Sequence, residues 1–261
     1  NIYMMASKKS AGKTLTFKGK EYTVEELTEH SFDKPIDIAL FSAGGSTSEK
    51  FAPIAAAHGV TVVDNSSQWR MDKEVPLVVP EVNPQDIAWN KGIIANPNCS
   101  TIQAMVALKP LQDKYGIKRV VYSTYQAVSG SGVKGINDLK NGLAGDDEHL
   151  QAYAHPIAGN CLPHIDVFTD NGYTKEEMKM INETHKILGD DDIKVTATTV
   201  RVPVFDSHSE SINIELEKPF ELEDVVELFK NSPGIVVQDD VAHNVYPLAR
   251  DAAGTDAVYI G

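Results

Sequence analysis

Short apolar runs rich in β-branched residues alternate with stretches of helical periodicity in the first half of the chain. Strands and helices that alternate in this way form a mostly parallel sheet with helices on both faces. A glycine-containing turn follows the first run, and Ser46 and Glu49 then form a capping-box pattern. The pattern predicts an α/β fold with a doubly wound first domain, whose strands are expected at residues 36–43, 60–64, 77–82 and 92–95.

The second half of the chain has a different pattern. Long strands are predicted at residues 119–128 and 195–204, and residues 211–217 alternate polar and apolar side chains with a period of two. Such alternation indicates an antiparallel or mixed sheet with one solvated face. We therefore predict an α+β domain with a mixed sheet in residues 100–261, after a first domain in residues 1–99.

The sequence also makes predictions for residues 134–158, for residues 174–188 and for the two ends of the chain. Residues 134–158 are rich in Gly, Asp and His without clear periodicity, whereas a helix is predicted over residues 174–188, capped by Thr174 and Glu177. Nothing before Ile36 resembles the strand and Gly-rich turn that open a doubly wound domain. We therefore expect the chain to lack terminal segments at both ends.

Composition narrows the classes of partner. The chain has 261 residues, 42% hydrophobic and 23% charged, which is enough apolar material for a sizeable core. Its 24 Lys and Arg against 37 Asp and Glu argue against a nucleic-acid-binding surface. No apolar run approaches the roughly 18 residues that cross a bilayer. A cytoplasmic protein without nucleic-acid or membrane partners is expected.

Cys99 is the candidate nucleophile. It follows the predicted strand at 92–95 and opens a helical pattern, and a thiol at a helix N-terminus loses its proton more readily than a free thiol. The alternative is an inert core thiol, since cysteine is often buried. A turn fixed by Pro97 between two asparagines favours the nucleophile. Cys161 lacks a following helix start and is expected to be the inert kind.

His208 is the candidate base, because it lies between two predicted strands where a loop can aim it at a site. Arg201 lies seven residues earlier, so on one regular strand the two side chains would face opposite sides. Pro203 and the turn at residues 206–207 must therefore break the strand. No close pairs of Cys, His and Asp have zinc-ligand spacing, so no metal site is predicted.

Four motifs in order resemble aspartate-semialdehyde dehydrogenase, closest to its Gram-positive type. They lie at residues 96–101, 123–132, 162–166 and 201–209, within a resemblance that runs from about Met5 to Gly261. The resemblance implies an NADP-binding domain and a substrate and dimerisation domain, in a homodimer or homotetramer. It also implies NADPH-dependent reduction of L-aspartyl 4-phosphate to L-aspartate 4-semialdehyde and phosphate, on the route to lysine, methionine and threonine.

The resemblance also implies roles for individual residues. Cys99 would form a thioester, His208 would be the general acid/base, and Gln126 would hold the thioester. Asn98 is a plausible oxyanion donor. In the substrate site, each charged group of the substrate would have its own partner: Arg201 for the carboxylate, Glu177 for the amine, and Lys179 with Arg70 for the phosphate.

The implied cofactor site has three parts. The first holds the 2′-phosphate of NADP, the second lines the dinucleotide and the third approaches the nicotinamide. Where the family usually has arginine, Lys9 keeps the charge but loses the planar fork, which leaves NADP preferred. The residues of the three parts are, in turn, Ser7, Lys9 and Ser10; Ser42, Ala43, Gly44 and Gly45; and Ser129 with Gly130.

Three alternatives stay open at this point. An N-acyl-glutamyl-phosphate reductase has the same thioester chemistry, although Glu177 and Lys179 argue against it. A cysteine hydrolase would use Cys99 and His208 with water in place of hydride. The third is a catalytically silent fragment.

Overall fold

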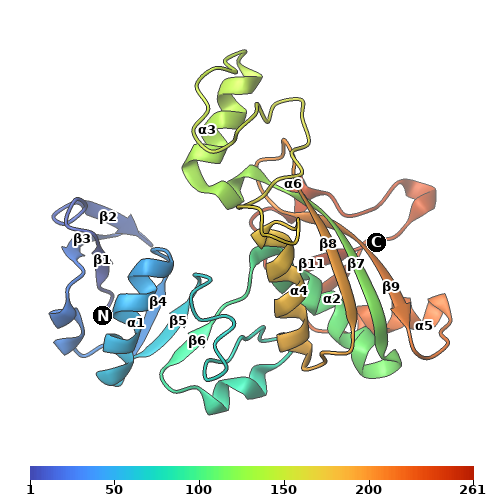
Figure 1. The fold of residues 1–261 in the computed structure, drawn as a ribbon, viewed down its shortest axis with the longest axis horizontal. Coiled ribbons are helices and arrows are strands. Elements are labelled where there is room, and N and C mark those ends of the chain that lie inside the picture. Colours follow the sequence, from blue (N-terminus) through green and yellow to red (C-terminus); the bar gives the residue numbers. More distant parts are fainter. The chain divides into compact units, whose positions relative to one another are not determined.

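The computed structural model describes residues 1–261, which fold into two compact units. The first consists of residues 1–78 and 85–96, and the second of residues 79–84 and 97–261. Each unit contains sheets of its own (Figure 1). The segment 79–84, which we assigned to the first domain, thus belongs to the second unit.

The first unit is built on a parallel sheet with the order β4-β5-β6. Its strands are β4 (Ile38–Phe41), β5 (Thr61–Asp64) and β6 (Ile93–Ala95), and helix α1 (Gly45–Ala57) connects the first two. The expected strand at 77–82 is wrong, because it contributes only an isolated bridge between Leu77 and Ala95. The capping box at Ser46 is also wrong, since Gly44 is the N-cap and the helix begins at Gly45.

A second, small sheet in this unit was not predicted. Strands β1 (Met4–Ala6), β2 (Thr14–Phe17) and β3 (Lys20–Glu26) form it in the order β1-β3-β2, and the short helix η1 (Glu29–Asp33) follows. The turn between β2 and β3 has positive φ at both central residues, 49° at Lys18 and 75° at Gly19, as tight hairpins require. Every residue of β2 is exposed, so this strand gives no burial pattern to recognise.

The second unit has the predicted mixed sheet. Its central strand β7 (Ile117–Gln126) pairs in parallel with β8 (Lys194–Arg201) and antiparallel with β9 (Ser209–Leu216). Helices α2 (Cys99–Tyr115) and α4 (Lys175–Leu188) pack on this sheet and on each other (Figure 1). Successive residues of β9 alternate between exposed and half-buried, which confirms the expected solvated face. The predicted fold class is confirmed.

Helix α3 (Gly132–Leu143) was missed because three glycines interrupt its helical pattern. Gly135 shows why glycine is needed there: a Cβ at this position would lie 2.6 Å from the Tyr153 hydroxyl oxygen and 2.7 Å from the Val128 carbonyl oxygen. Leu139 on the same helix is fully buried with Val128 and Ile157. Close packing against the following loop therefore stabilises α3.

The remaining elements of the chain are short. They are η2 (Pro84–Trp89), η3 (Val128–Ser131), α5 (Leu222–Lys230), β10 (Ile235–Val237), η4 (Val241–His243), α6 (Ala249–Ala252) and β11 (Val258–Ile260). Strands β10 and β11 pair in parallel. None of the helices in the structure is both long enough and apolar enough to span a membrane.

Candidate functional site

Three strand ends meet at one edge of the β8-β7-β9 sheet. Because β7 and β8 are parallel, Gln126 at the end of β7 lies opposite Arg201 at the end of β8. Because β9 is antiparallel, its first residue, Ser209, lies opposite Tyr125. His208 immediately precedes β9, so the topology brings Gln126, Arg201 and His208 to the same edge.

The strand breaks between Arg201 and His208, as predicted. Residues 202–208 belong to no strand; Pro203 lies in this segment, and Ser207 has a φ of 68°. Proline cannot donate to a sheet ladder, and positive φ turns the chain away from the extended direction. The break allows two side chains that a continuous strand would hold apart to reach one site.

Cys99 is the first residue of α2 and its side chain is exposed. Asn98 is the N-cap: its amide oxygen accepts hydrogen bonds from the Ser100 and Thr101 backbone N–H groups at 3.0 and 3.2 Å. The sulfur of Cys99 lies 3.2 Å from His208 Nε2. The predicted pair of nucleophile and acid/base is thus in contact.

The backbone N–H of Ala127 donates to His208 Nδ1 at 2.9 Å. A neutral imidazole has one acceptor nitrogen and one that carries the proton, so this bond assigns the proton to Nε2, which faces the sulfur. Burial, together with the positive charge of Arg201, lowers the pKa of His208 from 6.5 to about 4. His208 is therefore neutral near pH 7 and presents a hydrogen-bond donor to Cys99.

Glu176 is a site residue that the sequence analysis missed. It is buried, and its Oε1 accepts hydrogen bonds from Asn98 Nδ2 at 2.9 Å and from Gln126 Nε2 at 3.0 Å. Burial by itself would raise the pKa of Glu176, but the charge of Lys179 and the two amide donors outweigh it and lower the pKa. Asn98 thus serves as the helix cap through its amide oxygen, while its amide nitrogen donates to Glu176.

Glu177, the residue predicted for the substrate amine, holds backbone groups of α4 and β8. Its Oε2 accepts from the Thr174 backbone N–H at 2.7 Å and its Oε1 from the Thr199 N–H at 3.1 Å, so both carboxylate oxygens hold backbone groups. The capping box that we predicted from Thr174 and Glu177 is confirmed. The same sequence pattern thus already indicated a capping role for the Glu177 carboxylate.

Lys179 joins the same cluster. Its Nζ donates to Asp166 Oδ2 at 2.8 Å and to Glu176 Oε2 at 3.2 Å. Burial would lower the pKa of Lys179, but the two carboxylates outweigh burial and raise it. A spacing of three residues places Glu176 and Lys179 on one face of α4. The cluster therefore holds one ammonium group between the carboxylates of Asp166 and Glu176.

Arg201 is buried at the end of β8. Its Nη1 donates to the Ala127 carbonyl oxygen at 2.6 Å, whereas its Nε is buried without a partner. A buried donor without an acceptor costs free energy, and a ligand carboxylate would remove that cost. Gly130 lies against it: a Cβ there would be 3.0 Å from Arg201 Nη1 and 3.3 Å from His208 Cε1. Gly130 and Ser129, which we predicted to approach the nicotinamide, lie a few residues after the end of β7.

The other predicted residues lie in the first unit. Arg70 is buried, and its Nε and Nη2 donate to the carbonyl oxygens of Asn96 and Asn65 at 2.9 and 3.0 Å. Most of the residues expected for the cofactor lie in the turn after β1 and in the loop between β4 and α1; these are Ser7, Lys9, Ser10, Ser42, Ala43 and Gly44. Gly45 is the first residue of α1.

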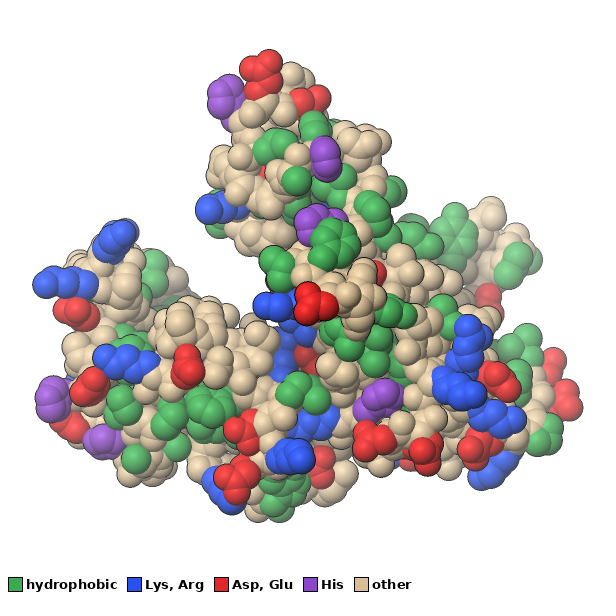
Figure 2. Space-filling view, viewed as in Figure 1, with side chains coloured by type: hydrophobic (Ala, Val, Ile, Leu, Met, Phe, Trp, Pro, Cys, Tyr) green, Lys and Arg blue, Asp and Glu red, His purple; other side chains and the backbone are tan.

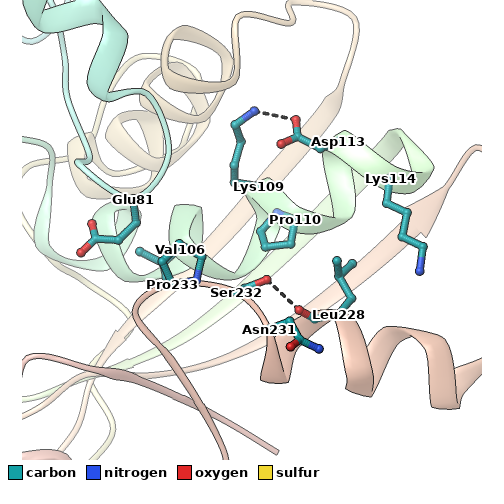
Figure 3. Close-up of a pocket in the computed structure, with 10 residues that line it drawn as sticks. All are labelled: Glu81, Val106, Lys109, Pro110, Asp113, Lys114, Leu228, Asn231, Ser232 and Pro233. Carbon is teal, nitrogen blue, oxygen red and sulfur yellow. Dashed lines mark hydrogen bonds and ion pairs between the residues drawn. The ribbon is translucent and has the colours of Figure 1, made fainter.

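Other parts of the second unit offer less chemistry. Cys161 is exposed, which corrects its prediction as a core thiol. A cavity of about 370 Å³ beside α2 and α5 contains none of the predicted residues, and its Lys109 is paired with Asp113 at 2.5 Å (Figure 3). Lys and Arg side chains are dispersed among acidic ones over the visible surface (Figure 2).

The family models match both halves of the chain. Residues 1–90 match the semialdehyde dehydrogenase NAD binding domain, and residues 108–261 match the semialdehyde dehydrogenase dimerisation domain. The aspartate-semialdehyde dehydrogenase of Aquifex aeolicus is 58% identical over 100% of this chain and 78% of its own length. The chain belongs to the aspartate-semialdehyde dehydrogenase family.

Solved structures agree with this membership. Aspartate semialdehyde dehydrogenase II of Vibrio cholerae, complexed with ASA, has a TM-score of 0.94 and 47% identity over 99% of this chain and 78% of that one. The Candida albicans enzyme with NADP has a TM-score of 0.75 and 26% identity over 97% of this chain and 78% of that one.

We predict that iodoacetamide alkylates Cys99 well before Cys161. Both thiols are exposed, so accessibility does not separate them. Only Cys99 combines a helix start with a donor nitrogen at 3.2 Å, and both favour the reactive thiolate. Peptide mass mapping after brief labelling near neutral pH measures the order. Faster labelling of Cys161 in freshly reduced protein would contradict the assignment.

Proposed function

We propose that the chain catalyses the NADPH-dependent reductive dephosphorylation of L-aspartyl 4-phosphate to L-aspartate 4-semialdehyde. The observation that carries the proposal is the 3.2 Å contact between Cys99 Sγ and His208 Nε2 at the start of α2. The nucleophile Cys99, the hydrogen-bond donor His208 and the buried cation Arg201 all lie in the second unit. Family membership supports the same reaction.

The chemistry begins at Cys99. Its thiolate attacks the acyl carbon, an S–C bond forms, the C–O bond to phosphate breaks, and phosphate leaves a thioester behind. Hydride transfer to the thioester carbon is the chemistry that NADPH supplies when it is bound. The negative charge that then develops on oxygen has the His208 Nε2–H as its donor. Cleavage of the S–C bond releases the aldehyde and restores the thiolate.

The charged residues would bind the substrate. We assign the substrate carboxylate to Arg201, whose unpartnered Nε supports this role. We assign the amine to Glu176 in place of Glu177, and the phosphate to Lys179. Gln126, held by Glu176, would orient the thioester.

The cofactor residues fit an anionic dinucleotide. The 13-residue helix α1 has no side-chain cap, so its first backbone N–H groups suit a phosphate, and Gly44 adopts a φ of 91° that side chains disfavour. Lys9 is exposed in the turn after β1 and would pair with the 2′-phosphate of NADP, with Ser7 and Ser10 beside it. We propose a homodimer or homotetramer through the dimerisation domain and, from the motifs, the Gram-positive type.

A direct assay tests the reaction. With L-aspartate 4-semialdehyde, phosphate and NADP⁺, the protein should form NADPH, measured by absorbance, only when phosphate is present. Cys99→Ser should abolish it, and His208→Ala should lower kcat by about 10²–10⁴. Ester hydrolysis without NADP⁺ would favour the cysteine hydrolase. Turnover of an N-acyl-glutamate semialdehyde in its place would favour the related reductase.

Two adjacent residues test the substrate assignment. Glu176→Gln removes the charge and keeps an acceptor oxygen, so KM should rise by a factor equivalent to about 1.5–3 kcal/mol. Glu177→Gln is the matched control on the same helix turn. It should leave KM unchanged and cost stability of about 0.5–1 kcal/mol, since it weakens the cap. The reverse pattern would restore Glu177 as the ligand.

A further inference from the structure

Two side-chain contacts run in parallel between helix α2 and the start of strand β9. The first joins Cys99 to His208 at 3.2 Å, and the second runs from Gln103 Nε2 to Glu210 Oε1 at 2.8 Å. Gln103 lies four residues after Cys99, a rise of about 6 Å along a helix. Glu210 lies two residues after His208, about 6.6 Å along a strand. The spacings match, so the second contact fixes the register of the first.

We propose that Gln103 and Glu210 are positioning residues that hold His208 against the Cys99 sulfur. The proposal rests on the proposed function of Cys99 and His208. Gln103 Nε2 also lies 3.4 Å from the carbonyl oxygen of His208, so one amide group reaches both His208, which precedes β9, and Glu210, the second residue of β9. Both side chains act through the backbone that carries His208.

The surroundings of Glu210 keep this clamp uncharged near pH 7. Burial raises the pKa of Glu210 to about 8, and the Gln103 donor lowers it only in part. Its Oε2 is buried without a partner. The titratable groups that face it are Tyr122 from β7, and His208 and Tyr259, which line the same cavity of about 460 Å³. No Lys or Arg lines that cavity, so no positive charge stabilises the carboxylate.

The sign of the pH effect follows from these groups. Below about pH 8 the clamp is a neutral acid bound to an amide, and above that pH a carboxylate without a counter-charge forms in a buried position. The Gln103 hydrogen bond stays in place on ionisation, because an amide donor favours the carboxylate. The new negative charge, two residues after His208, opposes formation of the Cys99 thiolate, so the reactivity of Cys99 should rise less steeply with pH above about 8 than a single thiol ionisation requires.

The rate of iodoacetamide alkylation at Cys99, measured by mass mapping from about pH 6 to 9, tests the proposal without substrate or NADPH. Gln103→Leu breaks the clamp and should slow alkylation at neutral pH at least about fivefold, because the His208 N–H is no longer held at the sulfur. Glu210→Gln keeps an acceptor and cannot ionise. It should alkylate within about twofold of the unchanged protein at neutral pH and lack the inflection near pH 8.

Gln112→Leu is the matched control, since Gln112 lies on the same helix and also has two hydrogen bonds, to Asp190 and to the Ile117 N–H. It should leave Cys99 alkylation unchanged. The proposal is overturned if folded Gln103→Leu alkylates like the unchanged protein, or if Glu210→Gln retains the inflection. Should Gln103→Leu not fold, the Glu210→Gln profile decides. Normal clamp behaviour without turnover would count against the proposed function and not against the clamp.

Discussion

The peptide groups of Ala127 hold both side chains on which the chemistry depends. Its N–H donates to His208 Nδ1 at 2.9 Å, and its carbonyl oxygen accepts from Arg201 Nη1 at 2.6 Å. Ala127 is fully buried directly after β7. Because backbone groups at a strand end have little freedom, they fix the His208 tautomer and the Arg201 guanidinium together. The proposed hydrogen-bond donor and the proposed carboxylate ligand therefore share one rigid support.

The acidic residues of α4 supply the second support. Glu176 accepts hydrogen bonds from the side-chain amides of Asn98 and Gln126, and the Glu183 carboxylate accepts one from the Asn98 backbone N–H at 2.7 Å. Both acids are buried, and they lie seven residues apart on one face of the helix. Buried carboxylates are costly unless hydrogen-bonded, so these bonds both stabilise the acids and fix the turn that carries Cys99.

Much of the fold and of this site was predictable, for identifiable reasons. The predicted strand-to-helix junction indicated that Cys99 is the nucleophile. Pro203 indicated a break in the strand that allows His208 and Arg201 to reach one site. The register of β7 with β8 and β9 was not predictable, because pairing depends on contacts far apart in sequence. Helix α3 was not predicted because glycines interrupt its helical pattern, and tertiary packing, not the local sequence, explains why glycine is present there. Glu176 and Glu177 differ by one position, and only the cap on Thr174 separates their roles.

The central claim is that His208 is neutral and carries its proton on Nε2, facing Cys99. Nitrogen NMR of the ¹⁵N-histidine-labelled protein measures this directly, with His208→Ala to assign the signals. The account predicts a protonated Nε2 and an acceptor Nδ1 throughout about pH 5.5 to 8, since the pKa is lowered to about 4. A ring protonated on Nδ1, or an imidazolium near pH 7, would contradict it.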